Sequence, residues 1–178
     1  MGMPSAVLIH KIRPRHLIAL SVVAAVATFL TTGTASAAAT ASGAYAPLSL
    51  YEGNWKVIPD GQSTVDRVHD QCARVGLFFA CQQTVNSKPG PLLVFIPSAA
   101  GHYRTQVVLP DGAALGAPGT LRISGEHWVY LSGPNAKGNW YRTTNDFQGR
   151  DRIRFTVAHS TDGKHWIVTL AGVEERVR

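Results

Sequence analysis

Short apolar segments, each interrupted by Gly, Pro, Asn or Asp, follow one another from Leu50 almost to the C-terminus, and this pattern constrains the fold more than any other feature. Apolar segments of this length between turn residues are typical of β-strands. We expect ten of them, at residues 54–58, 63–69, 76–84, 91–96, 102–109, 120–125, 127–131, 139–147, 151–160 and 164–173. Because the connections are short and no helical period occurs, sequential antiparallel pairing is the simplest topology. The sequence therefore predicts an all-β fold, a single antiparallel meander β-barrel of about 8–10 strands.

The first 37 residues have the composition of an export signal. A cationic start that ends at Arg15 precedes a charge-free apolar run at residues 17–30, and Ala35-Ser36-Ala37 matches a small-x-small cleavage site. The run of 14 residues is shorter than the roughly 20 that a spanning helix needs, although an uncleaved anchor stays the alternative. We predict a cleavable signal peptide at residues 1–37, cut after Ala37 or nearby. The product would be extracytoplasmic (secreted or periplasmic), with no membrane span.

The net charge and the length of the remaining chain limit its possible partners and its number of domains. Of 17 basic and 11 acidic residues, three basic ones lie in the signal, which leaves 14 basic against 11 acidic and a net charge of +3. The only basic cluster is Arg150, Arg152 and Arg154, which alternate with apolar residues as on a solvated sheet face, so no nucleic-acid partner is expected. A flexible linker rich in Ala, Ser and Thr is predicted at residues 38–49. Residues 50–178 then suffice for one domain with its own core.

Cys72 and Cys81 are the two cysteines of the chain. In an exported protein an even number of cysteines favours a disulfide over free thiols, and no second spaced pair completes a metal site. We therefore predict a Cys72–Cys81 bridge, a structural crosslink that closes a short loop.

Two hairpin turns predict which side chains share a face of the sheet. At Gly125-Glu126 a type II′ turn sets Ile123 opposite Trp128 and Leu121 opposite Tyr130. At Asp162-Gly163 a type I′ turn sets Val157 opposite Val168, Phe155 opposite Leu170 and His159 opposite Trp166. Both registers place apolar residues against apolar residues.

A third turn at Gln148-Gly149 leaves the register open, because loops of three or four residues also fit there. A two-residue turn would set Phe155 opposite Arg142 and Val157 opposite Trp140. In that register Arg142 points into the barrel. A buried guanidinium needs partners, so its donors would meet backbone carbonyls, a protein carboxylate or the anionic head of a ligand. The alternative is an Arg142 stacked on Trp140 near a barrel mouth.

Gly53-Asn54-Trp55 on the first strand, with Arg176 near the end of the last, resembles the Gly-x-Trp and closing arginine of the calycin barrels: lipocalins, fatty-acid-binding proteins and avidin-like proteins. The chain is similar to small secreted bacterial members of that group. The resemblance implies that Trp55 plugs one end of the barrel and that Arg176, or else Arg178, packs across it. The longer Gly-x-Trp-x-Gly-x-Gly pattern of haem-binding relatives is absent, since Lys56-Val57-Ile58 follows.

The inward aromatic residues and Arg142 form the candidate ligand site. Its members are Trp128, Tyr130, Trp140, Arg142, Phe155 and Trp166. The sequence contains no nucleophile elbow, phosphate loop, paired catalytic carboxylates or metal-binding His pair, so no catalytic residue, cofactor or metal is predicted. His159 and His165 are expected at a hairpin rim.

These observations predict an exported, non-enzymatic barrel that binds a small apolar or amphipathic molecule in its interior, with an anionic amphiphile as one option. One alternative is a barrel isomerase or cyclase with an interior acid or base, for which Asp146 or His159 would be the candidates. Another is a structural or interaction domain whose core is filled by side chains. A cavity with a perturbed carboxylate or histidine would favour the enzyme, and a solid core would favour the structural domain.

Overall fold

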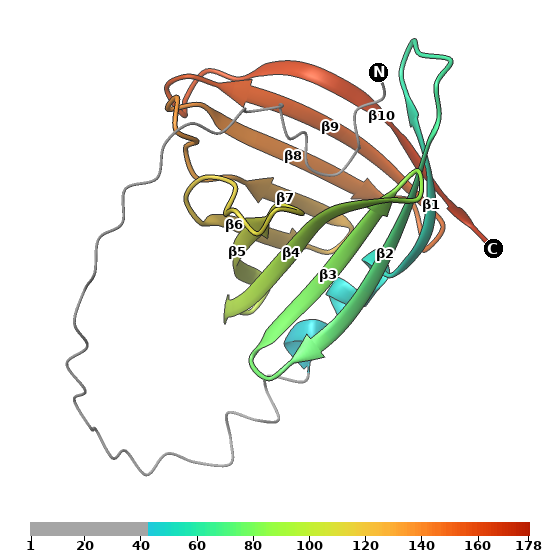
Figure 1. Cartoon of the computed structure of the whole chain (residues 1–178), viewed down its shortest axis with the longest axis horizontal. Helices are drawn as coiled ribbons and strands as arrows, with labels where there is room; N and C mark the ends of the chain where they lie inside the picture. Colours follow the sequence, from blue (N-terminus) through green and yellow to red (C-terminus); the bar gives the residue numbers. More distant parts are fainter. Residues whose placement is uncertain (1–42) are drawn as a thin grey trace.

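The computed structural model describes residues 43–178, which form ten β-strands and one short 3-10 helix (Figure 1). The predicted signal peptide and the first residues of the predicted linker lie outside the described residues. The elements are η1 (Pro47–Tyr51), β1 (Gly53–Pro59), β2 (Asp66–Val75), β3 (Phe78–Val85), β4 (Lys88–Ala99), β5 (His102–Val108), β6 (Gly119–Ser124), β7 (His127–Leu131), β8 (Trp140–Phe147), β9 (Arg152–Ser160) and β10 (Ile167–Val177).

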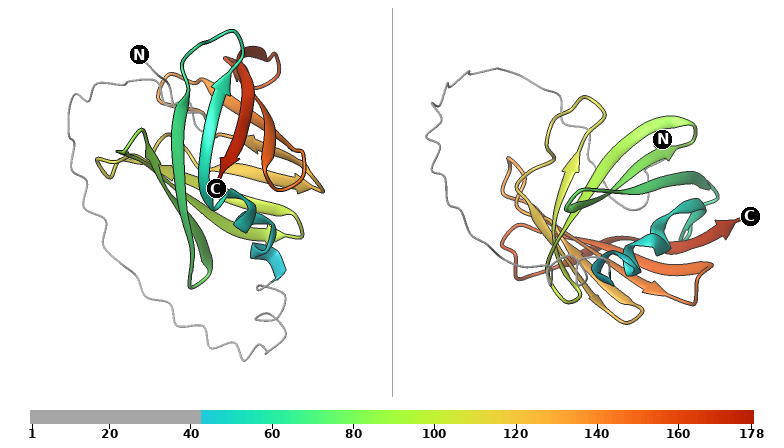
Figure 2. Two further views of the ribbon diagram at one scale, coloured as in Figure 1. Left: turned by 90° about the vertical axis from the view of Figure 1, so that its right-hand side faces the viewer. Right: turned by 90° about the horizontal axis from the view of Figure 1, so that it is seen from below.

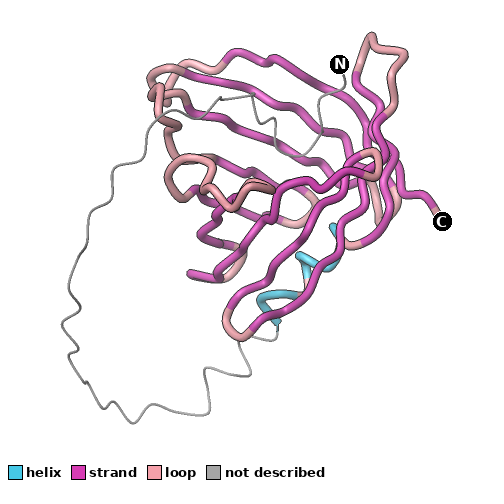
Figure 3. The backbone as a smooth tube through the Cα atoms, viewed as in Figure 1, coloured by secondary structure: helices cyan, strands magenta, loops and turns pink. Residues whose placement is uncertain are grey.

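Each strand pairs antiparallel with its neighbour in sequence, and β10 returns to pair with β1, so the sheet closes into a barrel. The predicted all-β meander barrel is confirmed. Figure 2 shows the closed sheet from two further sides, and Figure 3 shows that strands make up most of the described chain. No helix within residues 43–178 is long and apolar enough to cross a membrane.

The N-terminal segment belongs to the folded unit from residue 43, earlier than the sequence suggested. Leu48 is fully buried and Tyr45 is 6% exposed, and both pack in the core of the barrel. The Tyr45 hydroxyl donates to the Leu77 carbonyl (2.8 Å), and the Tyr103 hydroxyl donates to the Ala44 carbonyl (2.5 Å). The predicted flexible linker therefore does not extend to residue 49, because apolar side chains from this segment fill one end of the barrel, where η1 lies (Figure 1).

Barrel closure brings together the two residues singled out by the calycin resemblance. Trp55 on β1 lies directly opposite Arg176 on β10, and the guanidinium carbon lies 4.1 Å from the centre of the tryptophan ring. Arg176 also donates to the carbonyls of Leu50 (2.8 Å) and Glu52 (2.6 Å). Trp55 is 1% exposed, and its indole N–H donates to the Tyr51 carbonyl. This contact joins the first strand, the last strand and η1.

Cys72 on β2 and Cys81 on β3 lie opposite each other in the ladder and form a disulfide, as predicted. Cys81 is buried and faces the interior of the barrel. Because the strand ladder already joins these residues, the crosslink fastens a hairpin that is close in sequence.

The register at Gly125-Glu126 is confirmed. Ile123 lies opposite Trp128 and Leu121 lies opposite Tyr130. Gly125 has a φ of +60°, a conformation that glycine adopts without steric cost.

The register proposed at Gln148-Gly149 is wrong, because the loop between β8 and β9 is four residues long. Phe147 lies opposite Ile153, and the Gln148 N–H donates to the Arg152 carbonyl (2.8 Å). The longer loop moves the pairing by three residues, and an odd shift exchanges the faces of a strand. Phe155 therefore faces Asn145, and Arg142 lies opposite Ala158 on the other face of the sheet.

The register proposed at Asp162-Gly163 is also wrong, because the loop continues to Trp166. The Asp162 carboxylate accepts from the N–H groups of Lys164 and His165 (both 2.8 Å), and Ser160 Oγ accepts from the Gly163 N–H (2.9 Å). These hydrogen bonds to side chains satisfy backbone N–H groups of the loop, which therefore need no partner strand. His159 then lies opposite Ile167, and a bulge between Val168 and Leu170 places Leu170 opposite Val157.

We predict that Trp55→Ala lowers the free energy of unfolding by roughly 3–5 kcal/mol, the cost of truncating a buried aromatic residue. The matched control is Trp166→Ala, since Trp166 is only partly buried and lies in a loop. Chemical denaturation of the two variants compares them directly. Equal losses of stability would show that Trp55 has no special part in closing the barrel.

Candidate functional site

The barrel interior has an aromatic end and a polar centre. Rings from η1 and the strands above it fill the aromatic end. Tyr51 packs edge-on against Trp128 with ring centres 5.0 Å apart, and Trp128 and Phe147 lie 4.5 Å apart. Below these rings several polar side chains point inward although they are almost fully buried: Asp70, Gln83, Thr143, Asn145 and Glu174. The interior is therefore neither an empty apolar cup nor a uniform apolar core.

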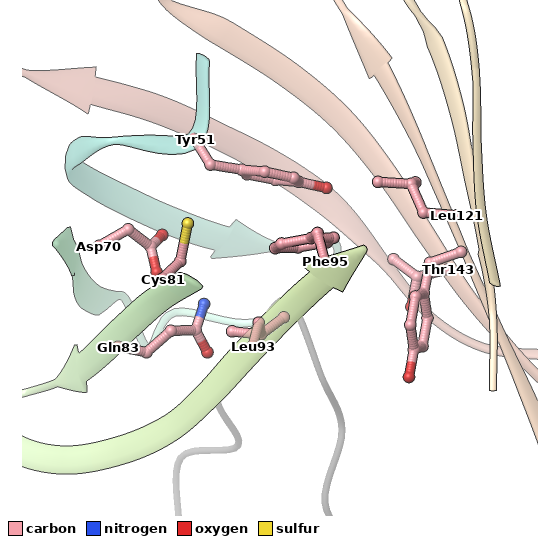
Figure 4. A pocket seen from close by; sticks show the side chains of 9 residues that line it. Tyr51, Asp70, Cys81, Gln83, Leu93, Phe95, Leu121 and Thr143 are labelled. Atoms are coloured by element: carbon pink, nitrogen blue, oxygen red, sulfur yellow. The ribbon is translucent and has the colours of Figure 1, made fainter. Parts of the chain in front are cut away.

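A cavity of about 30 Å³ lies within this interior (Figure 4). Its polar lining comes from Tyr51, Asp70, Gln83, Tyr130 and Thr143. Its apolar lining comes from Cys81, Leu93, Phe95 and Leu121. A space of this volume holds one or two water molecules, so a larger molecule would have to move the wall. Leu93 and Tyr130 keep part of their surface exposed and are the lining residues best placed to move.

Asp70 is the ionisable residue at the cavity wall. It lies on β2 between Gly53 of β1 and Gln83 of β3, it is 5% exposed, and its Oδ1 has no hydrogen-bond partner. Burial raises the pKa of Asp70 to about 7, and hydrogen bonding from the Gln83 amide offsets only part of that rise. Near neutral pH this carboxyl group is therefore partly protonated.

Glu174 is a second buried carboxyl group. It lies on β10 opposite Val57 and Ile153, it is 5% exposed, and its Oε1 has no partner. Burial raises the pKa of Glu174 to about 8, and the nearby charge of Asp70 adds to the rise. Glu174 does not line the cavity itself, and with this pKa it adds negative charge to the same interior only above about pH 8.

Tyr51 lies close enough to both carboxyl groups to be affected by their charges. It enters the barrel from the end of η1, and its hydroxyl accepts a hydrogen bond from the Asn145 amide (2.8 Å). The pKa of Tyr51 is raised, mainly by burial and further by the charges of Glu174 and Asp70. The Oδ1 of Asn145 is buried and has no partner. Unpaired buried acceptors are costly, and here the carboxyl and amide oxygens of three side chains, Asp70, Glu174 and Asn145, lie unpaired in one barrel interior.

The structure divides the aromatic set predicted as the ligand site. Trp128 and Phe155, each 1% exposed, and the partly buried Tyr130 point inward. Trp140, Arg142 and Trp166 lie on the outside, where the Arg142 guanidinium lies 4.6 Å from the centre of the Trp166 ring. Arg142 therefore stacks on a tryptophan near a barrel mouth, but on Trp166 and not on Trp140. An interior arginine at this position is ruled out by the four-residue loop after β8.

The acid and base suggested for an enzyme also lie away from the cavity. Asp146 is on the outer face, where its carboxylate pairs with His127 (2.6 Å), and both side chains are half exposed. His159 lies opposite Tyr141 and Ile167, and its Nδ1 is buried without a partner. No group of three or more His, Cys, Asp and Glu residues suited to a metal ion occurs within residues 43–178.

Sequence reasoning missed Asp70 and Glu174 because it ended their strands one residue too early. Residues 63–69 and 164–173 were expected as strands, whereas β2 continues to Val75 and β10 to Val177. The signal was present in the alternation of Val68, Asp70 and Cys72, which puts the carboxylate on the same face as the disulfide.

Comparisons with known proteins give the following result. No family model matches the chain, and no curated protein matches it. Among solved structures the chain is similar to Rv2717c from M. tuberculosis, with a TM-score of 0.49 and 19% identity over 76% of this chain and 98% of that one. It is also similar to the S-type phycobiliprotein lyase CPES from Guillardia theta, with a TM-score of 0.46 and 9% identity over 75% of this chain and 92% of that one.

We predict that Asp70→Asn raises the free energy of unfolding at pH 8 by about 2–4 kcal/mol and leaves it unchanged at pH 4. Because the pKa of Asp70 is raised in the folded state, the unfolded chain releases this proton first. Stability is therefore lost as pH rises from the unfolded pKa near 4 to the folded pKa of about 7. The asparagine stays neutral and avoids that loss.

Denaturation at a series of pH values tests this prediction, with Glu126→Gln as the control because Glu126 is exposed in the β6–β7 turn. Glu174→Gln should behave like Asp70→Asn, with the change extending to about pH 8. Parallel stability curves for Asp70→Asn and the parent protein would show that Asp70 is not a buried carboxyl group of raised pKa.

Proposed function

We propose that this protein is an exported, non-enzymatic calycin-like barrel that binds a small amphipathic molecule in its interior. The observation that carries the proposal is the cavity whose wall includes Asp70, a buried carboxyl group with an unpaired oxygen. An unpaired buried acceptor destabilises the fold unless a donor meets it, and a bound molecule can supply that donor. The apolar half of the lining suits the other end of such a molecule.

The polar end of the ligand should be a hydrogen-bond donor. An anionic head was expected while Arg142 was thought to point inward, and its place on the outer face removes that partner. The charges closest to the cavity belong to carboxyl groups, which repel an anion. A ligand larger than one or two water molecules would enter by displacing Leu93 and Tyr130.

Export is part of the proposal and rests on the sequence. The composition of residues 1–37 fits a cleavable signal, and the Cys72–Cys81 disulfide is of the kind that persists in oxidising compartments.

A second candidate function is acid–base catalysis on a small molecule held in the same cavity. It is favoured by the raised pKa values of Asp70 (about 7) and Glu174 (about 8), because a general acid or base works best near the ambient pH. The two functions differ in the fate of the ligand. A binding protein releases the molecule unchanged, whereas an enzyme releases a rearranged product and loses turnover in Asp70→Asn.

We predict that protein purified from its own host retains a small-molecule adduct, detected by native mass spectrometry. Thr143→Leu should lower the fraction carrying the adduct at least about fivefold, because the larger side chain fills the cavity and overpacking of this kind costs about 1–3 kcal/mol.

The matched control is Thr144→Leu, since Thr144 is the next residue along β8 and points to the opposite face. Thr144→Leu should keep the adduct. Adduct loss in both variants, or in neither, would contradict binding in the cavity.

A further inference from the structure

We infer that the interior site recognises a cation, the ammonium group of a small organic amine with a short apolar tail. The inference rests on the proposed function, because it names the chemistry of the molecule held in the same cavity. Three features of the interior support it: unpaired acceptor oxygens, carboxyl groups without a counter-charge, and aromatic walls.

Three buried side chains offer acceptor oxygens and receive no donor for them. Asp70 Oδ1, Asn145 Oδ1 and Glu174 Oε1 have no hydrogen-bond partner, and none of the three residues is more than 5% exposed. Asp70 lines the cavity, while Asn145 and Glu174 lie beside Tyr51, which also lines it. An ammonium group carries only donors and would meet what this interior lacks.

The carboxyl groups of the interior also lack a cationic partner. Within residues 43–178, no ion pair involves Asp70 or Glu174, and the pairs that do form engage exposed or rim residues. Arg176 shares the inner face of the closing strands, but its guanidinium is used by the carbonyls of Leu50, Glu52 and Arg150. The interior therefore carries uncompensated negative charge whenever Asp70 is ionised, and such a field attracts cations.

The walls of the cavity suit an ammonium head, whose size matches the present space. The rings of Tyr51 and Phe95 line the cavity and lie 6.4 Å apart in a nearly parallel arrangement, and aromatic faces attract cations. Asp70 and Gln83 lie at one end of the cavity, away from Leu121 and Thr143 (Figure 4). An ammonium group is close to water in size and would fit the present space beside Asp70, while its short tail would displace Leu93 and Tyr130, which keep part of their surface exposed.

The test compares three ligands of one shape and different charge by isothermal titration calorimetry at pH 8: n-butylammonium, n-butanol and n-butyrate. At this pH Asp70 is mostly ionised, since its pKa is about 7. We expect n-butylammonium to bind at least tenfold more tightly than n-butanol and n-butyrate to bind most weakly.

Variants identify the charge that is responsible for this order of affinities. Asp70→Asn should weaken the binding of n-butylammonium at least tenfold without weakening the binding of n-butanol. Glu174→Gln should cause a smaller loss of n-butylammonium affinity, because Glu174 does not line the cavity. Glu126→Gln, an exposed acid removed from the turn after β6, is the control for general surface charge and should change nothing.

The outcomes separate this inference from the proposed function. Equal affinity for n-butylammonium and n-butanol, tighter binding of n-butyrate, or an unchanged n-butylammonium affinity in Asp70→Asn would overturn the cation assignment. In each of these cases an adduct that disappears in Thr143→Leu would leave the binding function intact. Absence of binding by all three probes, together with no adduct from the host, would overturn both.

Discussion

The contact between Trp55 and Arg176 is the interaction on which the rest of the structure depends. A meander sheet closes only if its first strand reaches its last, and an unclosed sheet leaves two unpaired edges. Arg176 holds this seam from inside because its guanidinium lies on the Trp55 ring and donates to carbonyls before β1 and in the β8–β9 loop. One side chain thus joins η1, β1, β10 and that loop. Burial lowers the pKa of Arg176, yet arginine stays charged at any pH at which the protein folds, so the contact does not depend on pH.

Closure also creates the environment that gives the interior its chemistry. Asp70 is on β2 and Glu174 is on β10, on either side of β1, so the two carboxyl groups share one interior only when β10 has joined β1. The same closure holds η1 in place and brings Tyr51 into the interior, where its hydroxyl accepts from the Asn145 amide. A barrel of this size could fill these positions with Val or Leu and gain stability. Buried ionisable residues such as these lower the stability of the fold. Residues that lower stability in this way are concentrated at functional sites.

Local patterns in the sequence predicted the strands and one hairpin, whereas loop chemistry and strand ends escaped prediction. The ten apolar segments, the Ile123–Trp128 pairing and the Cys72–Cys81 bridge follow from alternation, a glycine turn and cysteine count, which are local or nearly local signals. The loops after β8 and β9 instead depend on side chains that bond loop backbone, such as Asp162, and on contacts with distant residues, such as that between Arg176 and the Arg150 carbonyl. The end of β10 depends on β1, a partner far away in the sequence, whereas the end of β2 lies in a hairpin with β3. Gly172, in the middle of β10, shows another long-range restriction, because a Cβ there would lie 2.5 Å from the Ile58 carbonyl oxygen and 2.7 Å from the Phe155 ring, and these neighbours are present only once β10 has paired with β1 and β9.

A change in one loop length reversed the expected charge of the interior, and this shows where the specificity of such a barrel originates. With a two-residue turn after β8, Arg142 would face inward and its guanidinium would set the interior potential positive. With the four-residue loop, Thr143, Asn145 and Phe147 take the inner face, and no cation from β8 reaches the cavity. The composition of the strand is the same in both cases, since an odd shift only exchanges the two faces. Asp70 is then the ionisable carboxyl group that lines the cavity, with Glu174 buried in the same interior. Loop length and strand alternation together therefore determine the sign of the charge that the barrel can accept. In this protein they leave buried acceptor oxygens in the interior without a cation beside them.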